Sequence, residues 1–142
     1  MDVLLELVTT GRIGRVRLGM LLSEAEEVLG SGAPHPAIRL LGPEASGYPY
    51  YWGDLSLYVS DGRVDRVVLQ PSEVIERDVF LEILRRSGTA FEPHPALTFD
   101  GQSAIRTDAG AVILFAHREA AEGLDTAGHY LVLARVMEVP AS

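Results

Sequence analysis

Apolar and polar side chains alternate most regularly between Tyr50 and Gln70. Two apolar runs at alternate or near-alternate spacing flank the dipeptide Asp61-Gly62. Alternation places every second side chain on one face of a strand, and Asp-Gly favours the tight turn that joins two antiparallel strands. This stretch therefore predicts a β-hairpin. Its core-facing residues would be Leu55, Leu57, Val59, Val64, Val67 and Val68.

Three segments show the three-to-four residue spacing of amphipathic helices. Residues 1–11 end in Gly11, residues 23–30 combine Ser23 and Glu26 at capping-box spacing, and residues 72–88 begin with Ser72 and end at Gly88. In the third helix we expect acids in the first turn and arginines in the last. The residues predicted to face the core are Val3, Leu4, Leu7 and Val8 in the first helix, and Ile75, Val79, Phe80, Ile83 and Leu84 in the third.

The remaining segments predict strands and loops. Residues 12–19 suggest a half-buried edge strand, and residues 31–49 a long loop with a short strand at its centre. Strands are also expected at 96–99, 103–107, 111–117 and 129–139, and the apolar run "AVILF" predicts a central strand covered on both faces. The fold class expected is therefore α+β: one domain over residues 1–142, with a mainly antiparallel twisted sheet and two or three helices packed on one face.

The tetrapeptide "PHPA" occurs twice, at 34–37 and at 93–96. A helix ending in glycine precedes each copy and strands follow it, which is compatible with a duplicated unit, a pair of metal-binding histidines or a coincidence of composition. A residue before proline is excluded from the helical region of backbone space. We therefore expect both copies to be extended connectors that follow a helix and lead into a strand.

Composition narrows the function classes. The chain has 142 residues, no cysteine, and a net charge of −8 from 20 acidic and 12 basic residues. The absence of cysteine excludes disulfides and thiolate chemistry, and the negative charge argues against a nucleic-acid partner and favours a basic protein partner. The opening residues lack a secretory pattern and no apolar run is long enough for a membrane span, so we expect no membrane association and a cytoplasmic location.

Motifs of catalysis are lacking. The four histidines (His35, His94, His117 and His129) have no zinc-binding spacing, and neither a Gly-x-Ser-x-Gly elbow nor a phosphate-binding glycine loop occurs. We therefore assign no catalytic residue, no metal site and no cofactor, and expect a protein that is not an enzyme.

An aromatic stretch stands out instead. Four rings lie within five residues and two acidic residues lie nearby. Aromatic side chains are enriched at protein interfaces, and carboxylates can meet basic residues of a partner. The predicted partner-binding residues are Tyr48, Tyr50, Tyr51, Trp52, Asp54 and Glu44. The alternative is that alternate rings, such as Tyr50 and Trp52, enter the core at the start of a strand.

Two resemblances to known families involve the N-terminal half. The stretch "LGMLLSEAEEVLG", Leu18–Gly30, resembles an element of the small lipoprotein of the outer-membrane β-barrel assembly machine, although the chain has no cysteine for lipid attachment. The longer order, an N-terminal helix followed by "IGRVRLGMLLSEAEEVLG" (Ile13–Gly30) and "WGDLSLYVSDGRVDRVVLQ", resembles small bacterial α+β proteins, largely uncharacterised, of which some accompany polymorphic toxins as immunity-type proteins. The second resemblance implies inhibition of a cognate toxin and brings no catalytic residues.

The function expected from the sequence is therefore non-catalytic protein binding. Its most concrete form is an immunity-type inhibitor that occludes the active site of a toxin with its aromatic and acidic side chains. The first alternative is a small-molecule-binding or enzymatic domain with a pocket between the sheet and the loop 31–49. The second is a module that associates with itself through an apolar C-terminal strand at a sheet edge.

Overall fold

The computed structural model describes residues 1–42, 47–119 and 127–137. The helical elements are α1 (Asp2–Thr10), α2 (Leu22–Leu29), α3 (Pro36–Leu41), α4 (Arg77–Arg86) and the 3-10 turn η1 (Pro95–Leu97). The strands are β1 (Ala33–Pro34), β2 (Pro49–Trp52), β3 (Leu55–Ser60), β4 (Arg63–Leu69), β5 (Phe91–Pro93), β6 (Gln102–Thr107), β7 (Val112–Arg118) and β8 (Gly128–Met137). No helix within the described ranges is long and apolar enough to cross a membrane.

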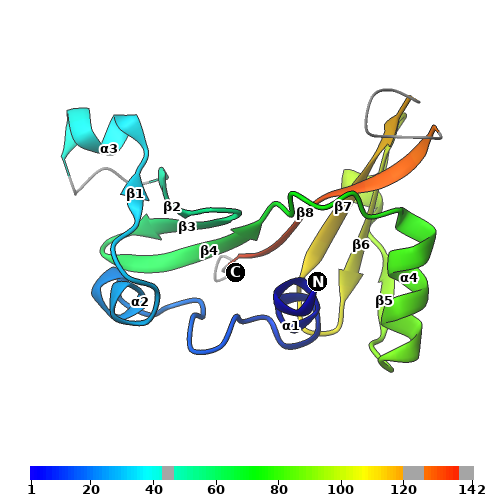
Figure 1. Cartoon of the computed structure of the whole chain (residues 1–142), viewed down its shortest axis with the longest axis horizontal. Coiled ribbons are helices and arrows are strands. Elements are labelled where there is room, and N and C mark those ends of the chain that lie inside the picture. The colour runs from blue at the N-terminus through cyan, green and yellow to red at the C-terminus, as the bar shows by residue number, and fades with distance from the viewer. Residues whose placement is uncertain (43–46, 120–126, 138–142) are drawn as a thin grey trace.

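The strands form one open antiparallel sheet of eight in the order β1-β2-β3-β4-β8-β7-β6-β5. Each half is a run of four strands that are neighbours both in sequence and in space, and the halves meet where β4 pairs with β8 (Figure 1). The predicted α+β class with a mainly antiparallel sheet is confirmed. The hairpin of residues 55–69 is confirmed as well, since Asp61 and Gly62 both have the positive φ that its tight turn requires.

The order of elements is the same in the two halves. A helix, a short edge strand, a histidine, a short helical segment and three further strands follow one another as α2-β1-His35-α3-β2-β3-β4 and as α4-β5-His94-η1-β6-β7-β8. Because the sheet order reads the same from both edges, the halves are related by an approximate twofold rotation about the β4–β8 junction. The topology therefore favours the duplication that the sequence left open.

The two "PHPA" copies occupy equivalent places in these halves. His35 and His94 both have extended backbone, as predicted, and each is followed by a proline at the start of a short helix. The prediction that the copies lead into strands was wrong, because proline at the first helical position leaves no amide donor unpaired and its φ already suits a helix. The likeness thus marks the same change from strand to helix in each half.

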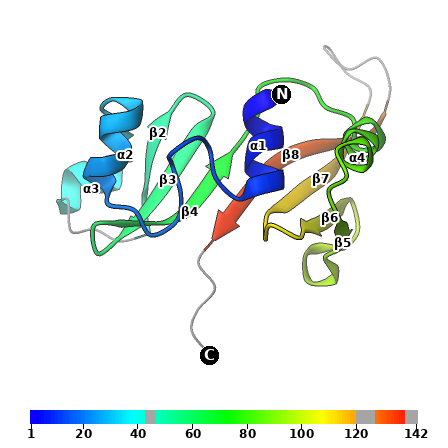
Figure 2. The same cartoon turned by 90° about the horizontal axis from the view of Figure 1, so that it is seen from below.

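One face of the sheet carries the core. Its strand residues cluster with Leu4, Leu7 and Val8 of α1, Ala25 of α2, and Phe80 and Leu84 of α4. The ring centroids of Phe80 and Phe115 lie 6.2 Å apart at the centre of the second half. Helices α1 and α2 lie on the same side of the sheet (Figure 2), while α3 stands at the β1 edge. We call the face that carries this cluster the core face and the opposite one the open face.

Helix α1 packs beneath the junction of the two halves. It contacts β8 and buries Leu4, Leu7 and Val8 there, and its end at Gly11 is closed by the bond from Gly11 N–H to the Leu7 carbonyl. No counterpart of α1 precedes α4 within the described part of the chain, so α1 is the element that departs from the twofold arrangement.

Several local predictions were wrong. Residues 12–19 form no strand, because Gly14 has positive φ and the chain makes a tight turn closed by mutual bonds between Ile13 and Val16. Residues 96–99 form η1 and a turn, and residues 31–49 contain β1, α3 and the start of β2 rather than one loop. The C-terminal strand β8 lies in the middle of the sheet and not at an edge, which removes the basis for self-association through it.

The helix starts also differ from prediction. Helix α2 begins at Leu22, and Glu24 Oε1 accepts from Leu21 N–H, so Ser23 is not the cap. Helix α4 begins only at Arg77, and Val79 is exposed instead of facing the core. Strand β7 is an interior strand as predicted, although Leu114 on its open side is only half-buried.

Replacing Leu7 tests the role of α1. Leu7→Ala removes a fully buried side chain beneath the β4–β8 junction, and the cavity should cost about 2–5 kcal/mol of the free energy of unfolding in urea. The matched substitution Val3→Ala, at an exposed position of the same helix, should change stability by less than about 0.5 kcal/mol. Equal effects of the two would contradict the packing described.

Candidate functional site

Strand β2 divides the aromatic stretch between the two faces of the sheet. Tyr50 and Trp52 pair with Leu57 and Leu55 and so lie on the core face, whereas Tyr51 pairs with Ser56 and lies on the open face. Side chains of successive strand residues point to opposite faces, which is why a run of rings is split in this way. Tyr48 precedes the strand, and Glu44 lies outside the described residues.

Trp52 is half-buried and bound to the segment that follows α2. It packs against the core cluster, and its indole Nε1–H donates a hydrogen bond of 3.0 Å to the Gly30 carbonyl at the end of α2. Its ring also lies over Gly32, where a Cβ would come within 2.5 Å of Cζ2. Trp52 therefore fastens the first turn after α2 to the edge of the sheet.

Asp54 is engaged in the fold as well. Its Oδ2 accepts from the Ser72 amide at 3.1 Å and from the Ser72 hydroxyl at 3.2 Å, while its carbonyl accepts from Gln70 N–H. These bonds tie the turn between β2 and β3 to the segment that leaves β4. The side chain is nevertheless exposed, so a partner could still reach the carboxylate.

His35 joins the aromatic residues on the outside. Its Nδ1 accepts from Ala37 N–H at 3.0 Å and so caps α3. Its ring stacks on Tyr48 with centroids 5.2 Å apart and lies 6.5 Å from that of Tyr51. The cap requires Nδ1 to be an acceptor, which leaves the other ring nitrogen to carry the proton.

Exposed leucines lie on the same short helix. Leu40 is 85% exposed and Leu41 66% exposed, while Ile38 of α3 is buried, and Tyr51 nearby is 38% exposed. We call His35, Tyr48, Tyr51, Leu40 and Leu41 together the aromatic end. It combines apolar side chains with polar ring atoms at one end of the molecule (Figure 1).

The histidines do not form a metal site. His35 and His94 follow the strands at opposite edges of the sheet, about 34 Å apart by strand spacing. His117 and His129 pair across β7 and β8 with ring centroids 5.5 Å apart, and Glu119 Oε1 lies 3.1 Å from His117 Nε2. No group of three or more potential ligands that could hold a metal occurs in the ranges 1–42, 47–119 and 127–137.

Cavities among the described residues are open and shallow. Four of about 290–400 Å³ lie on the surface, and none of them takes a lining residue from segment 31–49. One is lined by Phe91, Glu92, Arg106 and Asp108 at the β5 edge, and another by Arg77 and His129. None of these four cavities therefore supports a pocket between the sheet and that segment.

Sequence reasoning missed His35 as a member of the aromatic end. The dipeptide His35-Pro36 is a signal for this role, because a histidine directly before proline can cap the helix that the proline starts. The ring of such a histidine can then lie beside the next strand. Without the pairing of β1 with β2 that brings His35 beside Tyr51, the proximity could not be predicted.

Comparison of the chain with models of known protein families, with curated proteins and with solved structures finds no match. Functional argument therefore depends on the residues themselves.

Replacing Gly32 tests the seat of Trp52. Gly32→Ala places a Cβ against the indole, and the displacement should cost about 1–3 kcal/mol of stability and shift the emission of this single tryptophan to longer wavelength. Gly128→Ala is the matched control, because a Cβ there meets only ordinary contact at 3.8 Å. An unchanged emission spectrum and stability in Gly32→Ala would show that the indole does not lie over residue 32.

Proposed function

We propose that this chain is a non-catalytic protein-binding domain that docks a partner protein through the aromatic end. The observation that carries the proposal is the exposure of Tyr51, and of Leu40 and Leu41 on the helix that His35 caps, together with the stacking of His35 on Tyr48. Apolar side chains of this size, gathered at one place and rimmed by polar atoms, are typical of interaction sites in soluble proteins.

The division of roles within β2 supports the same surface. Trp52 and Asp54 hold the edge of the sheet in place, which fixes the positions of Tyr51 and Tyr48. A surface that is rigid before binding loses less conformational entropy on association. Tyr50, Trp52 and Asp54 remain in the proposal as neighbours of the contact, and Glu44, which lies outside the described residues, remains a predicted partner-binding residue.

The most concrete form of the proposal is an immunity-type inhibitor that acts in the cytoplasm by covering a toxin's active site. It is supported by the resemblance of the N-terminal helix, residues 13–30 and residues 52–70 to immunity-type proteins, and these segments contain α1, α2, β3 and β4. The net charge of −8 favours a basic partner, because complementary charge accelerates encounter. Occlusion needs no catalytic group.

The proposal can be tested on a partner captured from the source organism and then purified. In calorimetric titration, Tyr51→Ala and Leu40→Ala should each weaken binding about tenfold or more, because interface anchors of this kind contribute over about 1 kcal/mol each. His35→Asn keeps a residue that can cap α3 but removes the ring, and should weaken binding while leaving thermal stability near that of the wild type.

Val79→Ala provides the control, since Val79 is an exposed apolar residue on α4, away from the aromatic end. It should leave the affinity unchanged. Affinities that are unaffected by Tyr51→Ala and Leu40→Ala, or affected equally by Val79→Ala, would remove the aromatic end from the interface.

A further inference from the structure

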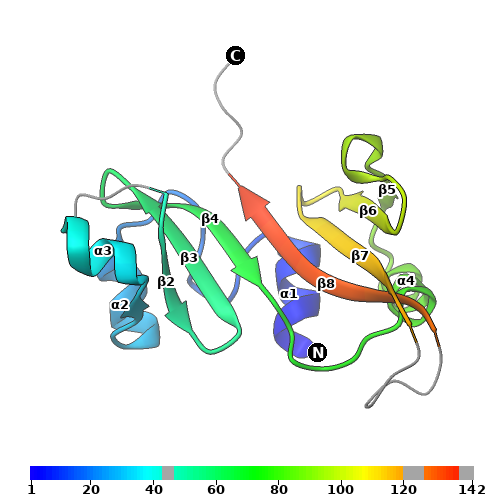
Figure 3. The same cartoon turned by 90° about the horizontal axis from the view of Figure 1, so that it is seen from above.

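The open face of the sheet carries a group of arginines at its centre. A row of directly paired residues crosses the strands from Tyr51 through Ser56, Val68, Arg135 and Val112 to Arg106. Arg66 lies on the same face one strand from Arg135, paired with Met137 and Tyr58. Figure 3 looks onto this face, with β4, β8 and β7 in front of α1.

The three arginines have few acidic neighbours. Their cross-strand partners are Tyr58 and Met137 for Arg66, Val68 and Val112 for Arg135, and Val112 and Glu92 for Arg106. Only Glu92 among them is acidic. Antiparallel sheets usually gain stability by placing opposite charges in such positions, so this arrangement is unusual for a chain with 20 acidic residues.

None of the three forms an ion pair with a carboxylate of the described residues. The Nε atoms of Arg66 and Arg135 are buried and have no hydrogen-bond partner within those ranges. Arg66 lies over the Tyr58 ring at 4.8 Å, and Asp65 beside it is bound by the Ser60 hydroxyl at 2.8 Å. The guanidinium groups thus keep hydrogen-bonding capacity that the described fold does not use.

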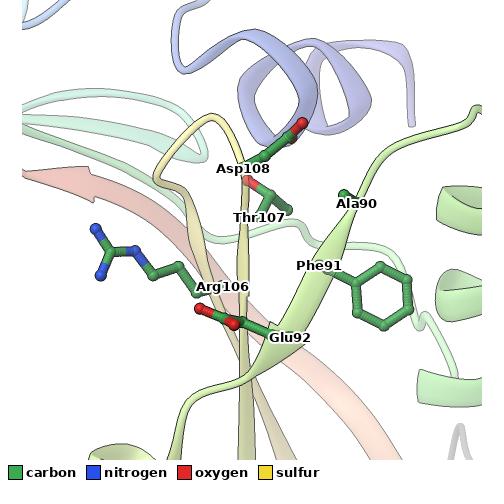
Figure 4. Close-up of a pocket in the computed structure, with 6 residues that line it drawn as sticks. All are labelled: Ala90, Phe91, Glu92, Arg106, Thr107 and Asp108. Atoms are coloured by element: carbon green, nitrogen blue, oxygen red, sulfur yellow. The ribbon is translucent and has the colours of Figure 1, made fainter.

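Figure 4 shows how Arg106 ends this group at the β5 edge. Arg106 of β6 and Glu92 of β5 point to the same side of the sheet, and Phe91 points to the other. Strand spacing places Arg106 and Arg135 about 10 Å apart, and Arg66 and Arg135 about 8 Å apart. Carboxylates at alternate positions of an extended chain are about 7 Å apart, which is close enough for long arginine side chains to reach them.

We propose that Arg66, Arg106 and Arg135 form a second docking surface, which binds an acidic, extended segment of a partner protein. Guanidinium groups bind carboxylates with two parallel hydrogen bonds, and here they do so between apolar neighbours that limit competition from water. This goes beyond the proposed function, since it depends on the open face and not on the aromatic end. The net negative charge of the chain influences how a partner approaches from a distance, whereas these arginines would bind carboxylates of the partner in direct contact.

A defined probe tests the proposal on the whole chain. A fluorescein-labelled peptide of alternating Glu and Thr should bind the wild type in fluorescence anisotropy, and added salt should weaken the binding. The triple variant R66Q/R106Q/R135Q should bind the Glu-Thr peptide with an affinity at least about tenfold below that of the wild type. The triple variant R12Q/R15Q/R17Q removes the same charge from an exposed loop and should bind like the wild type.

Controls separate recognition from structural support, because Val68 and Val112 pair with the arginines across the strands and long arginine stems can cover such apolar neighbours. Arg135→Lys keeps the charge and most of the stem but loses the two parallel hydrogen bonds of the guanidinium, so it should bind the peptide more weakly than the wild type and more tightly than Arg135→Gln, and thermal denaturation should show each variant folded. A matching Gln-Thr peptide should not bind.

Four outcomes would overturn the inference. They are no binding of the Glu-Thr peptide by the wild type, equal loss in both triple variants, equal binding of the Gln-Thr peptide, and a labelled oligouridylate that binds more tightly than the acidic peptide and displaces it. Partner binding that is unaffected by Tyr51→Ala and Leu40→Ala, with the arginine effect on the Glu-Thr peptide intact, would overturn only the proposed function.

Discussion

Pairing between β4 and β8, with α1 packed beneath it, joins the two halves into one sheet. Four residue pairs make this junction, and Val67 with Val136 and Leu69 with Ala134 supply its core side. Two four-stranded units that shared no strand pairing would each leave one long edge strand with free backbone groups. The junction removes both edges at once, and α1 covers the apolar side chains that come together there.

The outer edges are protected in a different way. Strands β1 and β5 are short and each contains a proline, Pro34 and Pro93, which lacks an amide hydrogen. An added strand would find few donors at either edge. Binding through side chains of an exposed surface, such as the aromatic end or the open face, is therefore better suited to this fold than extension of the sheet.

The sequence predicted correctly the elements that are formed by residues close together in the chain. The hairpin of β3 and β4 could be predicted because alternation and Asp61-Gly62 agree, and α1 because its apolar spacing ends at a glycine with the required φ. The turn at residues 12–19 could not be predicted, since arginines alternate there with Ile13 and Val16 as they would in an edge strand. The pairing of β4 with β8 joins residues far apart in the sequence, and no local signal contains it.

The candidate site shows the same limit. The aromatic stretch was visible in the sequence, and so was the alternative that Tyr50 and Trp52 face inward, but only the register with Leu57 and Leu55 assigns each ring to a face. The arginines were visible only as part of a total charge. That total is a sum over the whole surface, and it does not show whether arginines lie together on one face of the sheet while acidic residues lie elsewhere.

The matching order of elements in the two halves gives a physical basis for the difference between the two faces of the sheet. The two halves must both keep residues that pack on the core face and the proline that starts a helix after His35 or His94, because those positions determine folding in each unit. Positions on the open face are under no such requirement and can differ. The first half places Tyr51, Tyr58 and Arg66 there, and the second places Arg106 and Arg135, so the open face carries both aromatic and basic residues.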